Sequence, residues 1–134
     1  GEQLFLQKLS IFSKNKTFYL KDIRAFIKFP GSEKELECKP YTWRKAFFTF
    51  NENGKNIMKQ LQIDAKDYLI HFSIFPNDQT VIGYFAFTVM YSKDEMFDYI
   101  RFIFDDYNNN SIELKITKAE IEGNKLIFDD NIWK

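Results

Sequence analysis

The sequence predicts an all-β fold, a single antiparallel sandwich or barrel of about eight or nine strands. Apolar and polar residues alternate over short runs in most of the chain, which is typical of half-buried strands. Breaks rich in Asn, Asp, Ser and Gly separate these runs at regular spacing, as they do in small β domains. Because 134 residues suit one hydrophobic core, we expect residues 1–134 to form a single β domain.

Two segments in the first half read as strands. Residues 22–29 place Ile23, Ala25, Ile27 and Phe29 on one face, which predicts a half-buried strand. Residues 41–50, YTWRKAFFTF, carry aromatic side chains in alternation with basic ones. The simplest interpretation is a core strand, with Trp43 and Phe47 inside and Arg44 outside.

The segment that follows fits two structures. Residues 56–67 place apolar side chains on one face of a helix, so a short helix is one alternative. The same residues also alternate as a strand after Asn53-Gly54, a dipeptide typical of tight hairpin turns. We favour the hairpin.

The second half contains the most apolar strand. Residues 81–91, VIGYFAFTVMY, are apolar on both faces, which predicts a central strand covered on both sides. Residues 111–117, SIELKIT, alternate and predict a half-buried strand. The side chains expected in the core are Ile74, Phe85, Phe87 and Phe102.

Residues 61–72, LQIDAKDYLIHF, resemble the tyrosine corner of immunoglobulin-like sandwiches. In that motif Asp64 would open a bend and Tyr68 would begin the next strand. Lys66 departs from the motif, which prefers a small residue two positions before the tyrosine. The resemblance implies an Ig-like arrangement of the sandwich.

Charge is divided unevenly along a chain that is neutral overall. Residues 1–66 carry thirteen Lys and Arg against seven Asp and Glu, whereas residues 67–134 carry six against twelve. Strands that are distant in sequence usually mingle in a sheet, so we expect these charges to mix on the surface. A neutral total does not favour phosphate binding, and nucleic acid is not an expected partner.

The stretch FDDYNNNS, residues 104–111, contains the residue types of a calcium loop. Starting at Asp106, however, the sixth position is Ser111 instead of Gly and the twelfth is Thr117 instead of Glu. Asn and Asp also cluster in turns, because they tolerate left-handed backbone and cap their own loops. We expect a turn, and we expect no metal site and no cofactor.

Catalytic residues are scarce. His71 is the only histidine and Cys38 the only cysteine, and the pairs Asp94-Glu95, Asp105-Asp106 and Asp129-Asp130 consist of neighbours that a strand would point to opposite faces. A lone cysteine allows no intrachain disulfide, and no apolar run is long enough to span a membrane. A cytoplasmic location is favoured, with export after removal of a signal as the alternative.

The best candidate binding residues are Tyr41, Trp43, Arg44 and Lys45, because aromatic and arginine side chains are over-represented at interface hot spots. We therefore expect a non-catalytic recognition module that binds another protein, of a small neutralising, inhibitory or adaptor type. One alternative is a carrier that holds an apolar small molecule inside a barrel. A second is a hydrolase that uses a carboxylate and a tyrosine. The sequence leaves the oligomeric state open.

Overall fold

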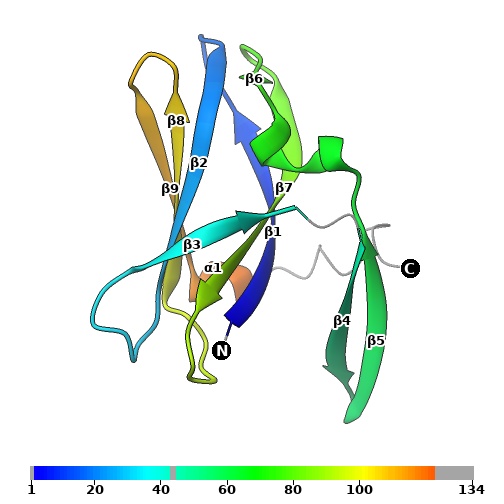
Figure 1. The fold of residues 1–134 in the computed structure, drawn as a ribbon. Coiled ribbons are helices and arrows are strands. Elements are labelled where there is room, and N and C mark those ends of the chain that lie inside the picture. The colour runs from blue at the N-terminus through cyan, green and yellow to red at the C-terminus, as the bar shows by residue number, and fades with distance from the viewer. Residues whose placement is uncertain (1, 43–44, 123–134) are drawn as a thin grey trace.

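The computed structural model describes residues 2–42 and 45–122, and it confirms the all-β prediction (Figure 1). Short turns connect most of the strands, and three brief helical segments accompany them. The strands are β1 (Glu2–Phe12), β2 (Phe18–Lys28), β3 (Leu36–Tyr41), β4 (Lys45–Glu52), β5 (Lys55–Gln62), β6 (Ile74–Phe75), β7 (Thr80–Met90), β8 (Tyr99–Asp106) and β9 (Ser111–Thr117). The helical segments are the 3-10 turns η1 (Ala65–Asp67) and η2 (Leu69–His71) and the helix α1 (Lys118–Glu122).

Seven strands form one antiparallel sheet that curls into a half-barrel (Figure 1). The strand order is β1-β7-β3-β2-β8-β9, and β6 pairs with the beginning of β2. β3 connects the two parts of this sheet, because Leu36–Cys38 pairs with β2 whereas Lys39–Tyr41 pairs with β7. β4 and β5 form a separate two-stranded sheet.

The core lies on the concave side of the main sheet and combines phenylalanine rings with aliphatic side chains. Phe102 of β8 meets Phe85 and Phe87 of β7 edge to face, with ring centroids 5.4 and 6.0 Å apart. All three are buried, as predicted. The residues predicted to face inward from 22–29 are also buried: Ile23, Ala25 and Ile27 of β2, and Phe29 just after it. The prediction for Ile74 is wrong, because it is exposed. β6 has only two residues, and its neighbour Phe75 is the one that enters the core.

β7 lies between β1 and β3, and residues 83–89 are buried on both faces, as predicted for this apolar run, whereas Ile82 and Met90 near its ends are exposed. Its inner face includes Gly83, where a Cβ atom would lie 2.8 Å from Cδ2 of Leu69. On the other face Tyr84 and Ala86 pack against Leu61, Ile63 and Tyr68, which belong to β5 and the segment after it. The end of β5 and the turns that follow it therefore cover a face of the sheet that would otherwise be open to water.

The hairpin predicted after Asn53-Gly54 is confirmed. Asn53 and Gly54 have positive φ angles of 52° and 80°, as a turn that matches the twist of two strands requires. Instead of the alternative helix, only the single 3-10 turn η1 forms, at Ala65–Asp67.

The strand expected to begin at Tyr68 does not form. The amide of His71 donates to the carbonyl of Tyr68 at 3.0 Å, so a second 3-10 turn, η2, follows the tyrosine directly. The tyrosine itself is buried, and its backbone makes a single parallel bridge to Tyr84. This residue is therefore an anchor for the covering segment.

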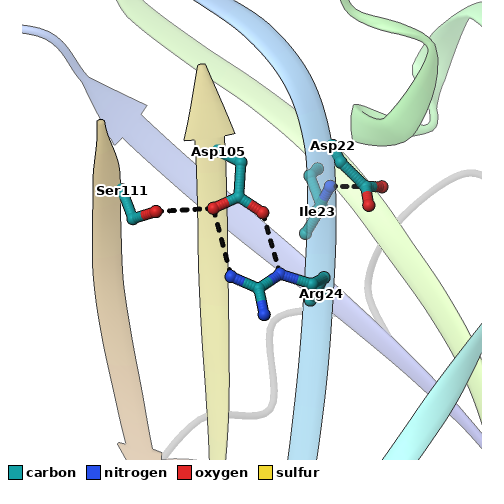
Figure 2. A network of polar contacts seen from close by, with 5 residues as sticks. All are labelled: Asp22, Ile23, Arg24, Asp105 and Ser111. Atoms are coloured by element: carbon teal, nitrogen blue, oxygen red, sulfur yellow. Dashed lines mark hydrogen bonds and ion pairs between the residues drawn. The ribbon is translucent and has the colours of Figure 1, made fainter. Parts of the chain in front are cut away.

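The charges of the two halves mix on the convex surface, as expected. Figure 2 shows Arg24 of β2 donating to both carboxylate oxygens of Asp105 on β8, with Nε–Oδ2 and Nη2–Oδ1 distances of 2.8 and 3.2 Å. The hydroxyl of Ser111 donates to the same carboxylate at 2.6 Å. The Arg24 guanidinium and then Ser111 hold the pKa of Asp105 below its usual value. This network ties β2, β8 and β9 together.

Candidate functional site

The hairpin of β4 and β5 extends away from the main sheet (Figure 1). Its two strands pair over eight positions, from Lys45 opposite Gln62 to Glu52 opposite Lys55. Within the described part of the chain neither strand joins the main sheet. Leu61 is fully buried near the base of the hairpin, which fixes this end to the body of the protein. Further along the hairpin, Phe47, Thr49 and Met58 are exposed.

One face of this hairpin carries exposed apolar side chains. Phe47 lies opposite Gln60 and Thr49 opposite Met58, so the pleat places Phe47 and Met58 on the same face. Phe47 is 66% exposed and Met58 is 67% exposed. The expectation that Phe47 is packed inside is therefore wrong. Among residues 2–42 and 45–122, β4 pairs only with β5, and Phe47 and Met58 stay open to solvent.

The sequence-predicted binding residues flank the same hairpin. Tyr41 is the last residue of β3, exposed and opposite Ala86 of β7, while Lys45 is the first residue of β4 and also exposed. Lys45 shares the pleat face of Phe47, and we call Lys45, Phe47 and Met58 the hairpin face. The predicted binding residues Trp43 and Arg44 lie outside the described residues.

Sequence reasoning missed Phe47 and Met58 as exposed residues. The signal was nevertheless present, because Asn53-Gly54 predicts a two-stranded ribbon, and such a ribbon has two faces to cover. The hairpin is also basic, with three Lys against one Glu between residues 45 and 62. Of these lysines only Lys45 shares the face of Phe47 and Met58, because Lys55 and Lys59 alternate with Met58 along β5 and belong to the other face.

A second exposed apolar region is the open side of the half-barrel, between the end of β1 and the start of β9. Phe12, Ile112 and Leu114 line a groove of about 210 Å³ whose remaining apolar lining comes from Ile11, Phe18, Phe75 and Phe104. Ile112 is 54% exposed and Leu114 is 36% exposed, so the expected half-buried face of residues 111–117 is mostly open. The reason is that β9 is the last strand of the sheet. The groove is smaller than typical small-molecule sites, which span roughly 300–1,000 Å³.

The loop at residues 105–110 is a self-capped turn. The carboxylate oxygen Oδ1 of Asp106 accepts the amides of Asn108 and Asn110, each at 2.8 Å, and Oδ2 accepts the side-chain amide of Asn110 at 3.3 Å. These hydrogen bonds, led by the Asn110 amide, lower the pKa of Asp106. Asn109 adopts the left-handed conformation, with φ of 63°. Both oxygens of the carboxylate are therefore engaged within the turn.

Tyr91 and Glu95 form a close tyrosine–carboxylate pair, and Tyr99 also hydrogen-bonds to Glu35. Tyr91 donates its hydroxyl proton to Glu95, which also accepts the amide of Gly31 at 2.7 Å. Burial and the hydrogen bond to Glu95 raise the pKa of Tyr91 to about 12, whereas the Tyr91 hydroxyl holds the pKa of Glu95 below its usual range. Both shifts move the pKa values away from neutral pH, so this pair is better suited to joining two loops than to transferring protons.

The cysteine and the histidine occupy different settings. Cys38 is buried in β3, and burial with the nearby Glu37 raises the pKa of its thiol to about 12, which keeps it protonated at neutral pH. His71 is exposed at the end of η2, which replaces the strand expected to begin at Tyr68. Among residues 2–42 and 45–122, no group of three His, Cys, Asp or Glu side chains is placed to hold a metal ion.

No family model, curated protein or solved structure matches this chain. In the part of the chain that the structure describes, no helix has the length and apolar character needed to cross a bilayer. Within the described residues, the hairpin face and the groove are thus two exposed apolar surfaces that suit contact with another molecule.

Proposed function

We propose that this protein is a non-catalytic recognition module that binds another protein through the hairpin face. The observation that carries the proposal is the exposure of Phe47 and Met58 on one face of a hairpin that stands apart from the main sheet. A large aromatic side chain loses little conformational entropy on binding and buries a large area. Methionine adapts its shape to a partner surface.

The chemistry of the hairpin indicates the kind of partner. Lys45 is exposed on the same face as Phe47, and Lys55 is exposed next to the turn. A complementary surface would offer an apolar pocket with carboxylates at its rim, because opposite charges at an interface rim steer association. Tyr41, Trp43 and Arg44 precede the hairpin in sequence, and we include them in the proposed binding surface. A small neutralising, inhibitory or adaptor protein would use such a surface.

The experiment compares matched variants of the full chain as bait in a lysate of the producing organism, followed by quantitative mass spectrometry. Phe47→Ala is matched by Tyr107→Ala, and Met58→Ala is matched by Met90→Ala, because each pair consists of exposed side chains of similar size. A genuine partner is captured by the parent and by both control variants. The amount captured by the Phe47→Ala variant is lower by at least roughly tenfold.

Purified partner and bait are then titrated by calorimetry, with the melting temperature of each variant measured in parallel. The proposal fails if Phe47→Ala and Met58→Ala fold normally and bind every captured protein as the parent does. It also fails if the control variants lose the same proteins.

A further inference from the structure

β9 is an edge strand whose sequence is complementary to itself when reversed. Residues Ser111–Thr117 pair with β8 on one side, and within the described residues no strand lies on the other side. Read in both directions from Leu114, the strand SIELKIT places Glu opposite Lys, Ile opposite Ile and Ser opposite Thr. An unpaired edge of this kind, without a proline, is a template for another strand.

We infer that a second copy of this chain adds to β9 in antiparallel orientation, with a two-fold axis at Leu114. In this arrangement Glu113 of each copy faces Lys115 of the other, and Ile112 faces Ile116. The two opposite-charge pairs are related by the same axis, as in any isologous interface. Directly opposed residues of opposite charge stabilise antiparallel strands.

Other registers of the same pairing are disfavoured. An axis at Glu113 would oppose two carboxylates, and an axis at Lys115 would oppose two ammonium groups, both of which are destabilising. A shift by one residue would place the apolar face of one copy beside the polar face of the other. Only the axis at Leu114 matches both the charges and the faces.

The contacts that Glu113 and Lys115 make within one chain are compatible with pairing to a second copy. Across the β8–β9 ladder Lys115 lies directly opposite Arg101, a like charge, while its Nζ atom lies 3.9 Å from the centre of the Tyr99 ring. Glu113 lies opposite Ile103 and reaches Arg101 diagonally, at 3.2 Å. A carboxylate directly opposite Lys115 is therefore missing within the ladder, and Glu113 of the second copy would supply it.

The apolar side of the strand supports the same occupant. Ile112 and Leu114 are exposed on the concave face and line the groove together with Phe12, which is 56% exposed. A second copy would place its own Leu114 and Ile116 beside these residues and close the open side of the groove. An unrelated partner would not need a strand that is palindromic in both charge and polarity. This inference is independent of the hairpin face.

The test is the association state of the full chain, measured by sedimentation and light scattering over a concentration series. The parent should be a dimer. Glu113→Lys and Lys115→Glu should each raise the dissociation constant by roughly tenfold or more, because each replaces two attractive pairs by two repulsive ones. A mixture of the two variants should pair again, since one chain then carries lysine at both positions and the other carries glutamate at both.

Cysteine substitution tests the register. Leu114→Cys should form an intermolecular disulfide on mild oxidation, because residues at the axis have Cα atoms roughly 4.5–5.5 Å apart. Ile116→Cys should not, since its symmetry mate is displaced by about four residues, or roughly 13 Å. Glu33→Lys, an exposed reversal away from β9, is the control and should leave the dimer intact.

A parent that stays monomeric over the whole series overturns the inference. So does a dimer that survives both charge reversals, or a mixture of folded variants that does not pair. Glu113→Lys also removes an intrachain partner of Arg101, which by itself costs stability. Lys115→Glu and Leu114→Cys leave that ion pair in place, so circular dichroism of these variants separates loss of pairing from loss of structure.

Discussion

Arg101 and Glu35 form a bidentate ion pair that joins β8 to the residue preceding β3. Nε and Nη2 of the arginine donate to the two carboxylate oxygens at 2.9 and 2.7 Å, and both side chains are about three-quarters buried. The guanidinium also lies over the ring of Phe26, 4.7 Å from its centre. The Arg101 hydrogen bond is the main reason that the pKa of Glu35 lies below its usual value.

This pair predicts a pH-dependent contribution to stability. Because the folded-state pKa of Glu35 is lowered, the contribution is complete above the unfolded pKa and is lost as the pH falls through the folded value. Near pH 7, Glu35→Gln should cost about 1–2 kcal/mol of unfolding free energy, and near pH 2 the cost should vanish. Urea denaturation of parent and variant at both pH values measures this. An equal loss of unfolding free energy at pH 7 and pH 2 would contradict a stabilising Arg101–Glu35 ion pair. So would an equal loss in the exposed control Glu33→Gln.

Phe87 is predicted to be a major contributor to the core. Its ring is fully buried, stacked on Phe5 at 5.2 Å and in edge contact with Phe102. Phe87→Ala should lower the unfolding free energy by about 3–5 kcal/mol in chemical denaturation, because truncation leaves a cavity. Ile82→Ala, an exposed position on the same strand, should cost less than about 1 kcal/mol. A loss of that small size for Phe87→Ala would contradict the role of Phe87 in the core.

The turn at residues 105–110 is predicted not to bind calcium. Asp106 uses both oxygens to cap the turn, so Asp106→Ala should lower the melting temperature, and acidification through the lowered pKa of Asp106 should do the same in the parent. Calorimetric titration of the parent with calcium should give no saturable heat. Saturable micromolar binding that Asp106→Ala abolishes, and that the exposed control Asp94→Ala preserves, would establish a metal site.

Gly54 is predicted to affect the local stability of the β4–β5 hairpin but not that of the main sheet. Its φ of 80° is unfavourable for any residue with a Cβ atom, so Gly54→Ala should cost about 1 kcal/mol locally. Hydrogen exchange followed by mass spectrometry should show faster exchange in residues 55–62 and unchanged exchange in residues 99–106. Thr49→Ala, exposed on the same hairpin, should change neither. Faster exchange in both segments would show that the hairpin and the sheet open as one unit.

The sequence predicted the strands whose two faces differ clearly, but it could not predict which strands lie at an edge. The alternation of residues 22–29 and of residues 111–117 is equally regular, yet Ile27 is buried whereas Ile112 is mostly exposed. The difference comes from strand order, which depends on contacts between distant segments. Ile74 failed as a core prediction for a similar reason, because one register position on a two-residue strand decided whether it or Phe75 faced inward.

The candidate site was predicted in part. Tyr41 and Lys45 are exposed, but the sequence placed Phe47 inside. An aromatic side chain in an alternating run is usually buried, and only the separation of the β4–β5 ribbon from the main sheet leaves this one open. The sequence does not show which part of the protein, if any, packs against the hairpin, because that depends on tertiary contacts.

The divided pairing of β3 has a consequence for how the chain reaches its native state. Leu36–Cys38 requires β2, which directly precedes it, whereas Lys39–Tyr41 requires β7, about forty residues further on. β3 is therefore complete only after a long loop has closed, and such closure costs entropy before the pairing compensates it. We expect folding on a timescale of about milliseconds to seconds, in a single cooperative step. Neither the part before residue 42 nor the part after it should fold alone, so cleavage between them before folding is complete should prevent the native sheet from forming.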